Sequence, residues 1–265
     1  MAKTQKERAF LRDLYINGDW TKRFTDLADK HILGLGGAEN LLYLNAGTGS
    51  HCFELREKLD KNTAVFARCE DEDLVNIARD KAIAVNADVD FSTIRFEDDS
   101  FDMVVADASL VEPSDVEEFV NEAVRVTRRG GTAAFFMPTS GSFGEIFSLL
   151  WEVLFNEDLG EHGRTAESMI TEIPTVSRIE EIAANAGLIN VRTNSAREVF
   201  EFENGAEFIA SPLVSDFLLP EWLKTLNDSE NERVSAKLSE LIDAEDGDLS
   251  FKFSVKATLI TGEKS

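Results

Sequence analysis

The segment from Leu41 to Gly49 constrains the fold more than any other part of the chain. It begins with an apolar run of strand-forming residues and ends in the turn Asn45-Ala46-Gly47-Thr48-Gly49. The residues after the turn carry apolar side chains at helical spacing: Cys52, Phe53, Leu55 and Leu59. A strand that enters a tight glycine turn and then a helix is typical of the first βα unit of an open α/β sheet. In such a unit the backbone N–H groups at the start of the helix face a ligand.

Apolar runs and helical periods alternate through the first half of the chain. Strands are predicted over 41–45, 63–67, 86–90, 101–107 and 132–137, and helices over 49–59, 71–82 and 114–128. Because strands that alternate with helices pair in parallel through right-handed crossovers, we expect a parallel sheet with helices on both faces. We also expect Arg129-Gly130-Gly131 to end the third of these helices, since glycine favours the left-handed conformation found there.

The flanking regions add further helices and two late strands. Helices are predicted over 143–155, 177–186 and 228–243, and strands over 191–202 and 251–257. Residues 5–33 are predicted to be helical, with a break at Asn17-Gly18-Asp19. Two late strands in this position would form an antiparallel edge on an otherwise parallel sheet.

The charge of the chain restricts its partners. There are 50 Asp and Glu residues against 27 Lys and Arg residues, a net charge of −23. Such a field repels phosphate backbones and anionic membranes, so nucleic acid and lipid surfaces are not expected as partners. The N-terminus has no apolar signal region and no segment reaches the ~20 apolar residues of a membrane span, which predicts a cytoplasmic protein. Two cysteines are too few for a disulfide framework, and the three scattered histidines predict no metal site.

Four segments carry a family resemblance. They are the strand and glycine turn at 42–49, the acidic strand end and helix at 69–79, the run at 90–105 that contains Phe96-Glu97-Asp98-Asp99-Ser100-Phe101-Asp102, and the helix with a Gly-Gly turn at 122–131. In these segments the chain resembles the class I S-adenosylmethionine-dependent methyltransferase family, in its branch with small-molecule substrates. The third segment is the most specific, because its spacing from Asp90 is characteristic of the family. The motifs cover roughly residues 40–137, and the order of elements extends the resemblance to the C-terminus.

The resemblance implies the fold and its parts. It implies an α/β fold, a Rossmann-like, doubly wound, mostly parallel seven-stranded sheet with an antiparallel edge strand and a helical lid. We expect a single methyltransferase-like domain over 1–265. Its parts would be N-terminal helices or a lid over 1–39, a cofactor-binding half over 40–137, and substrate-side helices with the last two strands over 138–265.

The resemblance also implies a binding site for S-adenosylmethionine at the carboxyl ends of the strands. Four residues of the turn would pack against the methionine and ribose portions of the cofactor: Asn45, Ala46, Gly47 and Gly49. Asp90 would accept a hydrogen bond from the adenine amino group, with Phe91 beside the ring. Asp107 lies at the carboxyl end of the fourth strand, where ligands of open α/β sheets bind.

The acid at the end of the second strand, which would bind the ribose hydroxyls, has two candidates. One alignment places Cys69 there, and a shift of one residue places Glu70 there, which we prefer. Structural roles stay open for several of these positions. Glu70 could be a solvated helix start in the acidic run 70–73, Asp107 could be a strand-end cap, and the glycines could serve the turn alone. Asp102 is expected to tether a loop rather than to act in catalysis.

Two residues depart from the family pattern. The family usually has an acid at the position of Tyr43, which helps to hold the cofactor's ammonium group, and glycine at the position of Asn45. Asn tolerates the left-handed conformation, so the turn can form without glycine. The alternative hypothesis is therefore a non-catalytic methyltransferase-fold protein that serves as a binding or regulatory subunit. A nicotinamide-dependent dehydrogenase is disfavoured because Ser50 follows Gly49 and the third glycine of that fingerprint is absent.

The residues after the fifth strand provide candidates for a substrate pocket. Phe143, Phe147 and Trp151 recur at helical spacing, which is compatible with core packing or with the lining of an apolar substrate pocket. No general base is identified, since His51 is predicted to lie at an exposed helix start. We expect an enzyme that transfers a methyl group from S-adenosylmethionine to a small apolar or aromatic molecule. A homodimer through the lid region is compatible with the sequence, although no feature demands it.

Overall fold

The computed structural model describes residues 3–32, 37–246 and 250–265. The chain divides into two compact units. The first comprises Met1–Pro138, Thr175–Ala196 and Ala257–Ser265, and the second comprises Thr139–Pro174 and Arg197–Lys256. The boundary after Pro138 lies one residue from the border expected between the cofactor-binding and substrate-side halves. The single domain over 1–265 stays a prediction.

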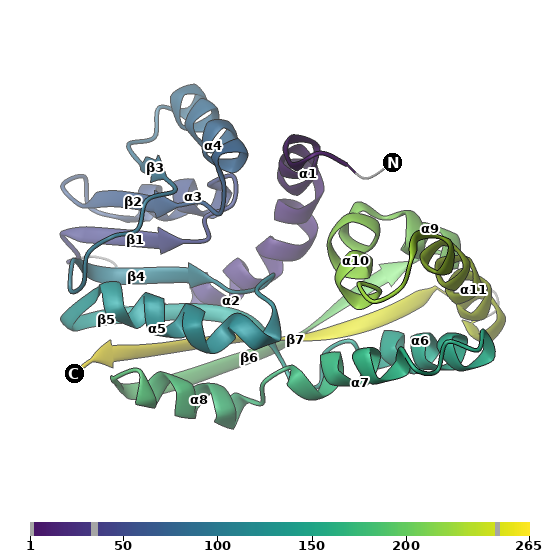
Figure 1. Cartoon of the computed structure of the whole chain (residues 1–265). Helices are drawn as coiled ribbons and strands as arrows, with labels where there is room; N and C mark the ends of the chain where they lie inside the picture. The colour runs from purple at the N-terminus through teal and green to yellow at the C-terminus, as the bar shows by residue number, and fades with distance from the viewer. Residues whose placement is uncertain (1–2, 33–36, 247–249) are drawn as a thin grey trace. The chain divides into compact units, whose positions relative to one another are not determined.

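The sheet has seven strands in the order β3-β2-β1-β4-β5-β7-β6 (Figure 1). Their bounds are β1 Asn40–Leu44, β2 Ala64–Arg68, β3 Asp90–Ser92, β4 Phe101–Asp107, β5 Thr127–Thr139, β6 Leu188–Phe202 and β7 Phe251–Lys264. Strands β1 to β5 pair in parallel, with antiparallel strands at the β7–β6 edge. The first unit contains 188–196 of β6 and 257–264 of β7, and the second unit contains the remainder of both strands. The predicted Rossmann-like sheet is confirmed.

The central strands of the first unit are buried because helices cover both faces of the sheet. Every residue of β1 after Asn40 is buried, and so is every residue of β4 except Asp102. The helices of this unit are α1 Gln5–Leu11, the π-helix η1 Arg12–Thr21, α2 Lys22–His31, α3 Ser50–Lys58, α4 Glu72–Val85, the 3-10 turn η2 Pro113–Asp115, α5 Val116–Val126 and α8 Val176–Asn185. Helix α5 contributes much of the core, because Phe119, Val120 and Ala123 lie on its buried face.

The predicted break at Asn17-Gly18-Asp19 is wrong. Helix α1, the π-helix η1 and helix α2 follow one another without a gap, and these three residues lie inside η1. The side chain of Asn17 is tied to the glycine turn by hydrogen bonds to Thr48 and Ser50. Tertiary contacts of this kind override the weak helix propensity of Asn and Gly, and the wider π-helical turn accommodates the segment.

The predicted helix stop at Arg129-Gly130-Gly131 is also wrong. Helix α5 ends at Val126, and Thr127 is already extended. Gly130 and Gly131 lie within β5 beside an irregularity in its pairing with β4. Gly130 has a φ of +72°, and a Cβ on Gly131 would meet the carbonyl oxygen of Asp102 at 2.8 Å. The two glycines therefore allow an irregularity within the strand and do not end a helix.

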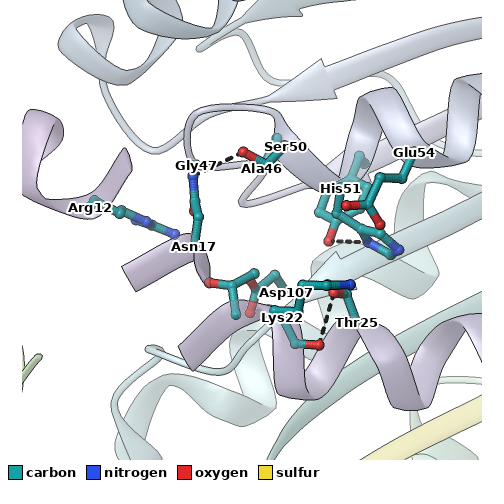
Figure 2. Close-up of a pocket in the computed structure, with 12 residues that line it drawn as sticks. Arg12, Asn17, Lys22, Thr25, Ala46, Gly47, Ser50, His51, Glu54 and Asp107 are labelled. Carbon is teal, nitrogen blue, oxygen red and sulfur yellow. Dashed lines mark hydrogen bonds between the residues drawn. The ribbon is translucent and has the colours of Figure 1, made fainter. Parts of the chain in front are cut away.

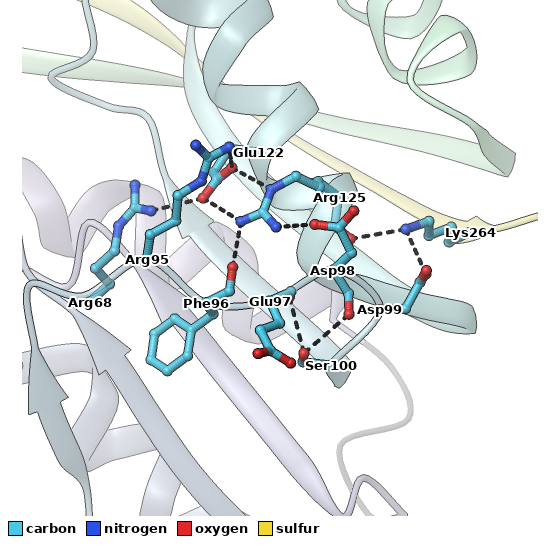
Figure 3. Close-up of polar contacts among 10 residues, drawn as sticks. All are labelled: Arg68, Arg95, Phe96, Glu97, Asp98, Asp99, Ser100, Glu122, Arg125 and Lys264. Carbon is cyan, nitrogen blue, oxygen red and sulfur yellow. Dashed lines mark hydrogen bonds and ion pairs between the residues drawn. The ribbon is translucent and has the colours of Figure 1, made fainter.

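The most specific family segment has a structural role. Figure 3 shows Arg125 of α5 reaching the loop before β4, where it donates to the carbonyl oxygen of Phe96 at 2.7 Å and pairs with Asp98. Glu122 accepts from Arg125 at 2.8 Å and from Arg68 at 3.0 Å. This network fixes the loop on the helix. Asp102 tethers a second loop, as expected, because its carboxylate accepts from the N–H groups of residues 39 and 40.

The second unit is mostly helical. Its helices are α6 Gly144–Asn156, α7 Gly163–Glu172, α9 Gly205–Ala210, the π-helix η3 Leu213–Leu218, α10 Leu219–Trp222 and α11 Asp228–Asp246. Aromatic rings form its centre, since Phe143 and Phe147 each lie 5.6 Å from Trp222 between ring centroids and Phe143 lies 6.0 Å from Phe253. Among the described residues of both units, no helix combines the length and apolar character needed to cross a membrane.

Candidate functional site

The glycine turn between β1 and α3 has the backbone of a ligand-binding turn. Asn45, Gly47 and Gly49 have φ values of +54°, +56° and +81°. Two of these positions are glycine, and Asn is one of the few other residues that tolerates this conformation. A Cβ on Gly49 would meet the ring of Phe91 at 2.6 Å. Position 49 therefore requires glycine, both for its backbone conformation and because a side chain would collide with Phe91.

Glu70 turns its side chain toward this turn, whereas Cys69 does not. The carboxylate of Glu70 accepts a hydrogen bond of 3.1 Å from the N–H group of Gly47. Cys69 is buried, and burial raises the pKa of its thiol to about 12, so it is an uncharged packing residue. Of the two candidates for the second-strand acid, Glu70 has the geometry to reach a ligand on the turn.

Arg12 lies over the same turn. Its Nη2 atom is 2.5 Å from a carboxylate oxygen of Glu70, and a Cβ on Gly47 would meet the guanidinium at 3.2–3.4 Å. Burial alone would lower the pKa of Arg12. The negative charges of Glu70 and Asp107 outweigh this effect, so the pKa is raised above its ordinary value. The Nε atom of Arg12 is buried and has no hydrogen-bond partner among the residues that the structure describes. The guanidinium is charged and fills the open face of the glycine turn.

Two further residues of η1 hold this segment on the turn. Asp13 accepts from the hydroxyl of Thr48 and from the ammonium group of Lys81, each at 2.5 Å. The Asn17 amide donates to Thr48 at 2.6 Å and to Ser50 at 3.0 Å. These groups are partly buried, where hydrogen bonds that involve a charge are stronger than neutral ones. We refer to Arg12, Asp13 and Asn17 as the N-terminal latch.

The latch closes the pocket at the carboxyl ends of the strands. Figure 2 shows Arg12 and Asn17 beside the turn, with His51 and Glu54 on α3 across the pocket. The pocket has a volume of about 30 Å³, whereas pockets for drug-sized ligands measure roughly 300–1,000 Å³. The side chain of Arg12 lies against both the Glu70 carboxylate and Gly47 of the turn. A ligand that contacts both groups therefore needs the latch to move.

Tyr43 and His51 form a buried pair beneath this pocket. The hydroxyl of Tyr43 is 2.9 Å from Nδ1 of His51, and Nε2 of His51 is 3.3 Å from Asp29. The prediction that His51 lies at an exposed helix start is wrong, since it is only 6% exposed. Its position in the first turn of α3 directs the ring toward β1. Burial, followed by the charge of Asp107, raises the pKa of Tyr43 well above its ordinary value, so the phenol is neutral.

The other predicted cofactor residues differ in how they are placed. Ala46 and Asp107 line the pocket. Burial raises the pKa of Asp107, and its carboxylate accepts from the N–H group of Ser109 at 2.8 Å. Phe91 is buried against Gly49, whereas Asp90 is exposed at the start of β3. The structure therefore brings Asp107 to the glycine turn together with Glu70, and it leaves Asp90 at the surface.

The predicted substrate residues all lie in the second unit. Phe143 and Phe147 are buried in its aromatic centre, the packing role that the sequence also allowed. Trp151 is 43% exposed, and its ring covers Gly163, where a Cβ would meet it at 2.2 Å. A substrate pocket at these residues stays a prediction.

Sequence reasoning missed the latch and Asp29. Asp13 and Asn17 are four residues apart and bond to each other at 3.2 Å, so their pairing was visible as an i, i+4 polar pair on a helix. The predicted break at residues 17–19 obscured it. No local pattern links Arg12 to Glu70, which lies 58 positions away in the chain. Only the fold brings them together.

Comparison with known proteins gives a family match over part of the chain and a likeness of fold over most of it. Residues 42–135 match the sequence model of a family described as methyltransferase domain. No curated protein matches the chain by sequence.

Three solved structures illustrate the likeness of the fold. The YcgJ protein from Bacillus subtilis is 15% identical, with a TM-score of 0.59 over 92% of this chain and 98% of that protein. The [4+2]-cyclase SpnF is 18% identical, with a TM-score of 0.52 over 93% and 83%. Phosphoethanolamine N-methyltransferase 2 from Haemonchus contortus, solved with S-adenosyl-L-methionine, is 14% identical, with a TM-score of 0.56 over 98% and 58%. At these identities the likeness establishes the fold alone.

Proposed function

We propose that the protein binds S-adenosylmethionine at the glycine turn and transfers its methyl group to a small molecule. The premise is that residues 42–135 match the methyltransferase domain model and that the chain has the class I S-adenosylmethionine-dependent methyltransferase fold. The bound cofactor would supply a sulfonium methyl group to an in-line displacement. Such a transfer depends on positioning and on a site that excludes water more than on any one catalytic side chain.

The hydrogen bond between Glu70 and Gly47 is the observation that carries this proposal. A carboxylate at the end of β2 is held on the N–H group of a turn in the left-handed conformation. A carboxylate so placed can accept hydrogen bonds from the hydroxyl groups of a ribose. The glycine backbone of the turn can approach the rest of a nucleoside closely once Arg12 has moved away. The buried Asp107 at the end of β4 adds a second carboxylate at the same edge of the sheet.

Within the N-terminal latch, Arg12 is the residue that covers the proposed cofactor site. In the closed arrangement its guanidinium neutralises Glu70 and covers Gly47. When it swings away, Glu70 becomes available to a ribose and the turn is uncovered. Since Arg12 lies in η1 and not in a strand, this movement needs no rearrangement of the sheet.

We propose a small apolar or aromatic molecule as the methyl acceptor. A net charge of −23 disfavours nucleic acid and anionic membranes. The half-exposed ring of Trp151 in the second unit is the member of the predicted aromatic set that can still contact a ligand. Phe143 and Phe147 would support it from the core.

Thermal melting with S-adenosylhomocysteine tests the cofactor assignment. A ligand that binds only the folded state stabilises it by about 2.7 kcal/mol at a hundredfold excess over its Kd, which raises the melting temperature by a few degrees. We expect a dose-dependent rise for the wild-type protein and a smaller one for Glu70→Gln. Asp80→Asn is the matched control, because Asp80 is an exposed acid of the neighbouring helix α4. No rise at any soluble ligand concentration would refute cofactor binding.

The second candidate is a methyltransferase-fold protein without methyltransferase activity. Tyr43 favours this candidate, because it replaces the acid that the family usually has at this position and its hydroxyl is hydrogen-bonded to His51. The cyclase among the structural neighbours carries an activity name other than methyltransferase on this fold. Methyl transfer from radiolabelled S-adenosylmethionine to any member of a small-molecule library would decide for the enzyme. Binding of S-adenosylhomocysteine without turnover would favour this second candidate.

A further inference from the structure

Asp29, His51 and Glu54 place three potential metal ligands around one point. Their ligand atoms all lie within 4.8 Å of one another. His51 and Glu54 are three residues apart on α3 and so share one face of that helix, whereas Asp29 approaches from α2. His51 Nε2 and Asp29 Oδ1 are already 3.3 Å apart. Ligands of a tetrahedral ion with bonds of about 2.0–2.1 Å are about 3.3 Å apart. Only the partly buried side chain of Glu54 would therefore have to move to bring all three ligands to the ion.

The imidazole is oriented by a second residue. The hydroxyl oxygen of Tyr43 lies 2.9 Å from Nδ1, the nitrogen that points away from the carboxylates. Metal-binding histidines use the nitrogen that does not bind the ion for a hydrogen bond of this kind, which fixes the orientation and tautomer of the ring. In the tautomer that binds a metal, Nδ1–H donates to Tyr43 and the lone pair of Nε2 faces Asp29 and Glu54.

Charge and access at the cluster also suit a cation. Lys58 pairs with the other oxygen of Asp29 at 2.6 Å and leaves Oδ1 directed to His51. Lys22 lines the pocket together with His51 and Glu54, and its ammonium group is bound to Asp26 at 2.7 Å. The two lysines therefore oppose three carboxylates, which leaves a net negative charge. The pocket of about 30 Å³ beside His51 and Glu54 has room for a water molecule.

We propose that Asp29, His51 and Glu54 bind a divalent transition-metal ion of the zinc class. One imidazole and two carboxylates form a mixed nitrogen and oxygen set, which suits zinc and its neighbours. Magnesium and calcium favour sites built from oxygen alone. Three protein ligands leave a fourth position for water on the pocket side. His51 and Glu54 line the pocket that the latch closes, but none of the three residues is proposed to bind the cofactor. Zn²⁺ binding by the metal-free protein is measured without any cofactor, so its result does not depend on the proposed function.

Titration of the metal-free protein with Zn²⁺ by calorimetry tests the site, with Co²⁺ absorption as a readout of the coordination geometry. We expect one ion per chain and a visible absorption band of tetrahedral Co²⁺. His51→Gln and Glu54→Gln should each lower the affinity for Zn²⁺ at least tenfold. Tyr43→Phe, which removes only the orienting oxygen, should lower it by about 10-fold to 100-fold. Circular dichroism of each variant shows whether it is folded.

Two controls exclude other sites. Glu57→Gln changes an exposed acid on the same helix, and His31→Gln changes an exposed histidine on α2. Both should bind Zn²⁺ as the wild-type protein does. The partly buried Glu54 can be changed without opening the core, so a folded Glu54→Gln variant is expected. Absence of stoichiometric binding, or undiminished binding by folded Glu54→Gln, would overturn the proposal.

Discussion

The guanidinium of Arg12 lies 2.5 Å from the carboxylate of Glu70 and at the same time covers Gly47. One side chain thus occupies both groups that a nucleoside cofactor would use at this edge of the sheet. Its buried Nε atom has no hydrogen-bond partner in the part of the chain that the structure describes, which makes the closed arrangement costly for a charged group. The cofactor that we propose for the glycine turn would therefore compete with Arg12.

Replacement of Arg12 with alanine should strengthen the binding of S-adenosylhomocysteine. When only a fraction of the molecules has an open site, the apparent Kd is raised by the inverse of that fraction, and removal of the competitor restores the intrinsic value. We expect Arg12→Ala to lower the Kd by about tenfold, which is about 1.4 kcal/mol. Calorimetric titration measures this change. Lys6→Ala, at an exposed position on α1, is the control and should leave the Kd unchanged. Equal affinities of wild type and Arg12→Ala would show that the latch does not compete.

Tyr43→Phe should destabilise the first unit. The change leaves Nδ1 of His51 buried without the oxygen that now lies 2.9 Å away. A buried polar group that loses its partner costs about 1–3 kcal/mol of unfolding free energy. Urea denaturation measures this loss. Tyr15→Phe removes the same hydroxyl from a side chain that is 44% exposed, and its midpoint should stay at the wild-type value. If both variants shift equally, the pair with His51 contributes nothing specific.

Much of the fold could be predicted because it rests on local periodicity. Strand β4 over Phe101–Asp107 has the predicted bounds, and helix α6 over Gly144–Asn156 differs from its prediction by one residue at each end. The errors occurred at glycines that were predicted to end a helical segment but are held inside an element by tertiary contacts. Gly18 lies inside a helical segment that the glycine turn holds in place, and Gly131 lies in a strand against the carbonyl oxygen of Asp102. Glycine allows the backbone an unusually wide range of conformations, but its surroundings determine whether a helix or strand ends there.

The candidate site was predictable only in part. The turn with Gly47 and the preferred acid Glu70 could be found because a strand, a turn and a helix follow one another in sequence. The contact of Arg12 with that acid, and of Asp29 with His51, joins distant parts of the chain through ion pairs that have no sequence signature. Their long-range pairing is a consequence of the fold, so it appears only once the N-terminal helices are placed on the sheet.

Acid should unfold the protein partly through Glu122. Its hydrogen bonds to Arg125, opposed by burial and helped by the neighbouring arginines, lower its pKa from 4.5 to about 2. Because the pKa is lower in the folded state, the stabilisation is present above the ordinary pKa of 4.5 and is lost as the pH falls toward 2. Urea midpoints between pH 6 and pH 2 should therefore decline less steeply for Glu122→Gln than for the wild type, although the variant is less stable at neutral pH. Glu118→Gln, an exposed change on the same helix, should keep the wild-type slope.

Two glycine-to-alanine changes should have opposite signs. At Gly49 the backbone has a φ of +81° and the new Cβ would lie 2.6 Å from Phe91, so Gly49→Ala should cost about 1–3 kcal/mol of unfolding free energy or more. At Gly18 an added methyl group would have no neighbouring atom within 4 Å and the residue is helical, so Gly18→Ala should gain about 0.5–1 kcal/mol. Chemical denaturation of both variants measures the two differences. A loss of stability in Gly18→Ala would restore the interpretation that the chain breaks at Asn17-Gly18-Asp19, and the N-terminal latch would then lack the continuous helical support that places Arg12 on Glu70.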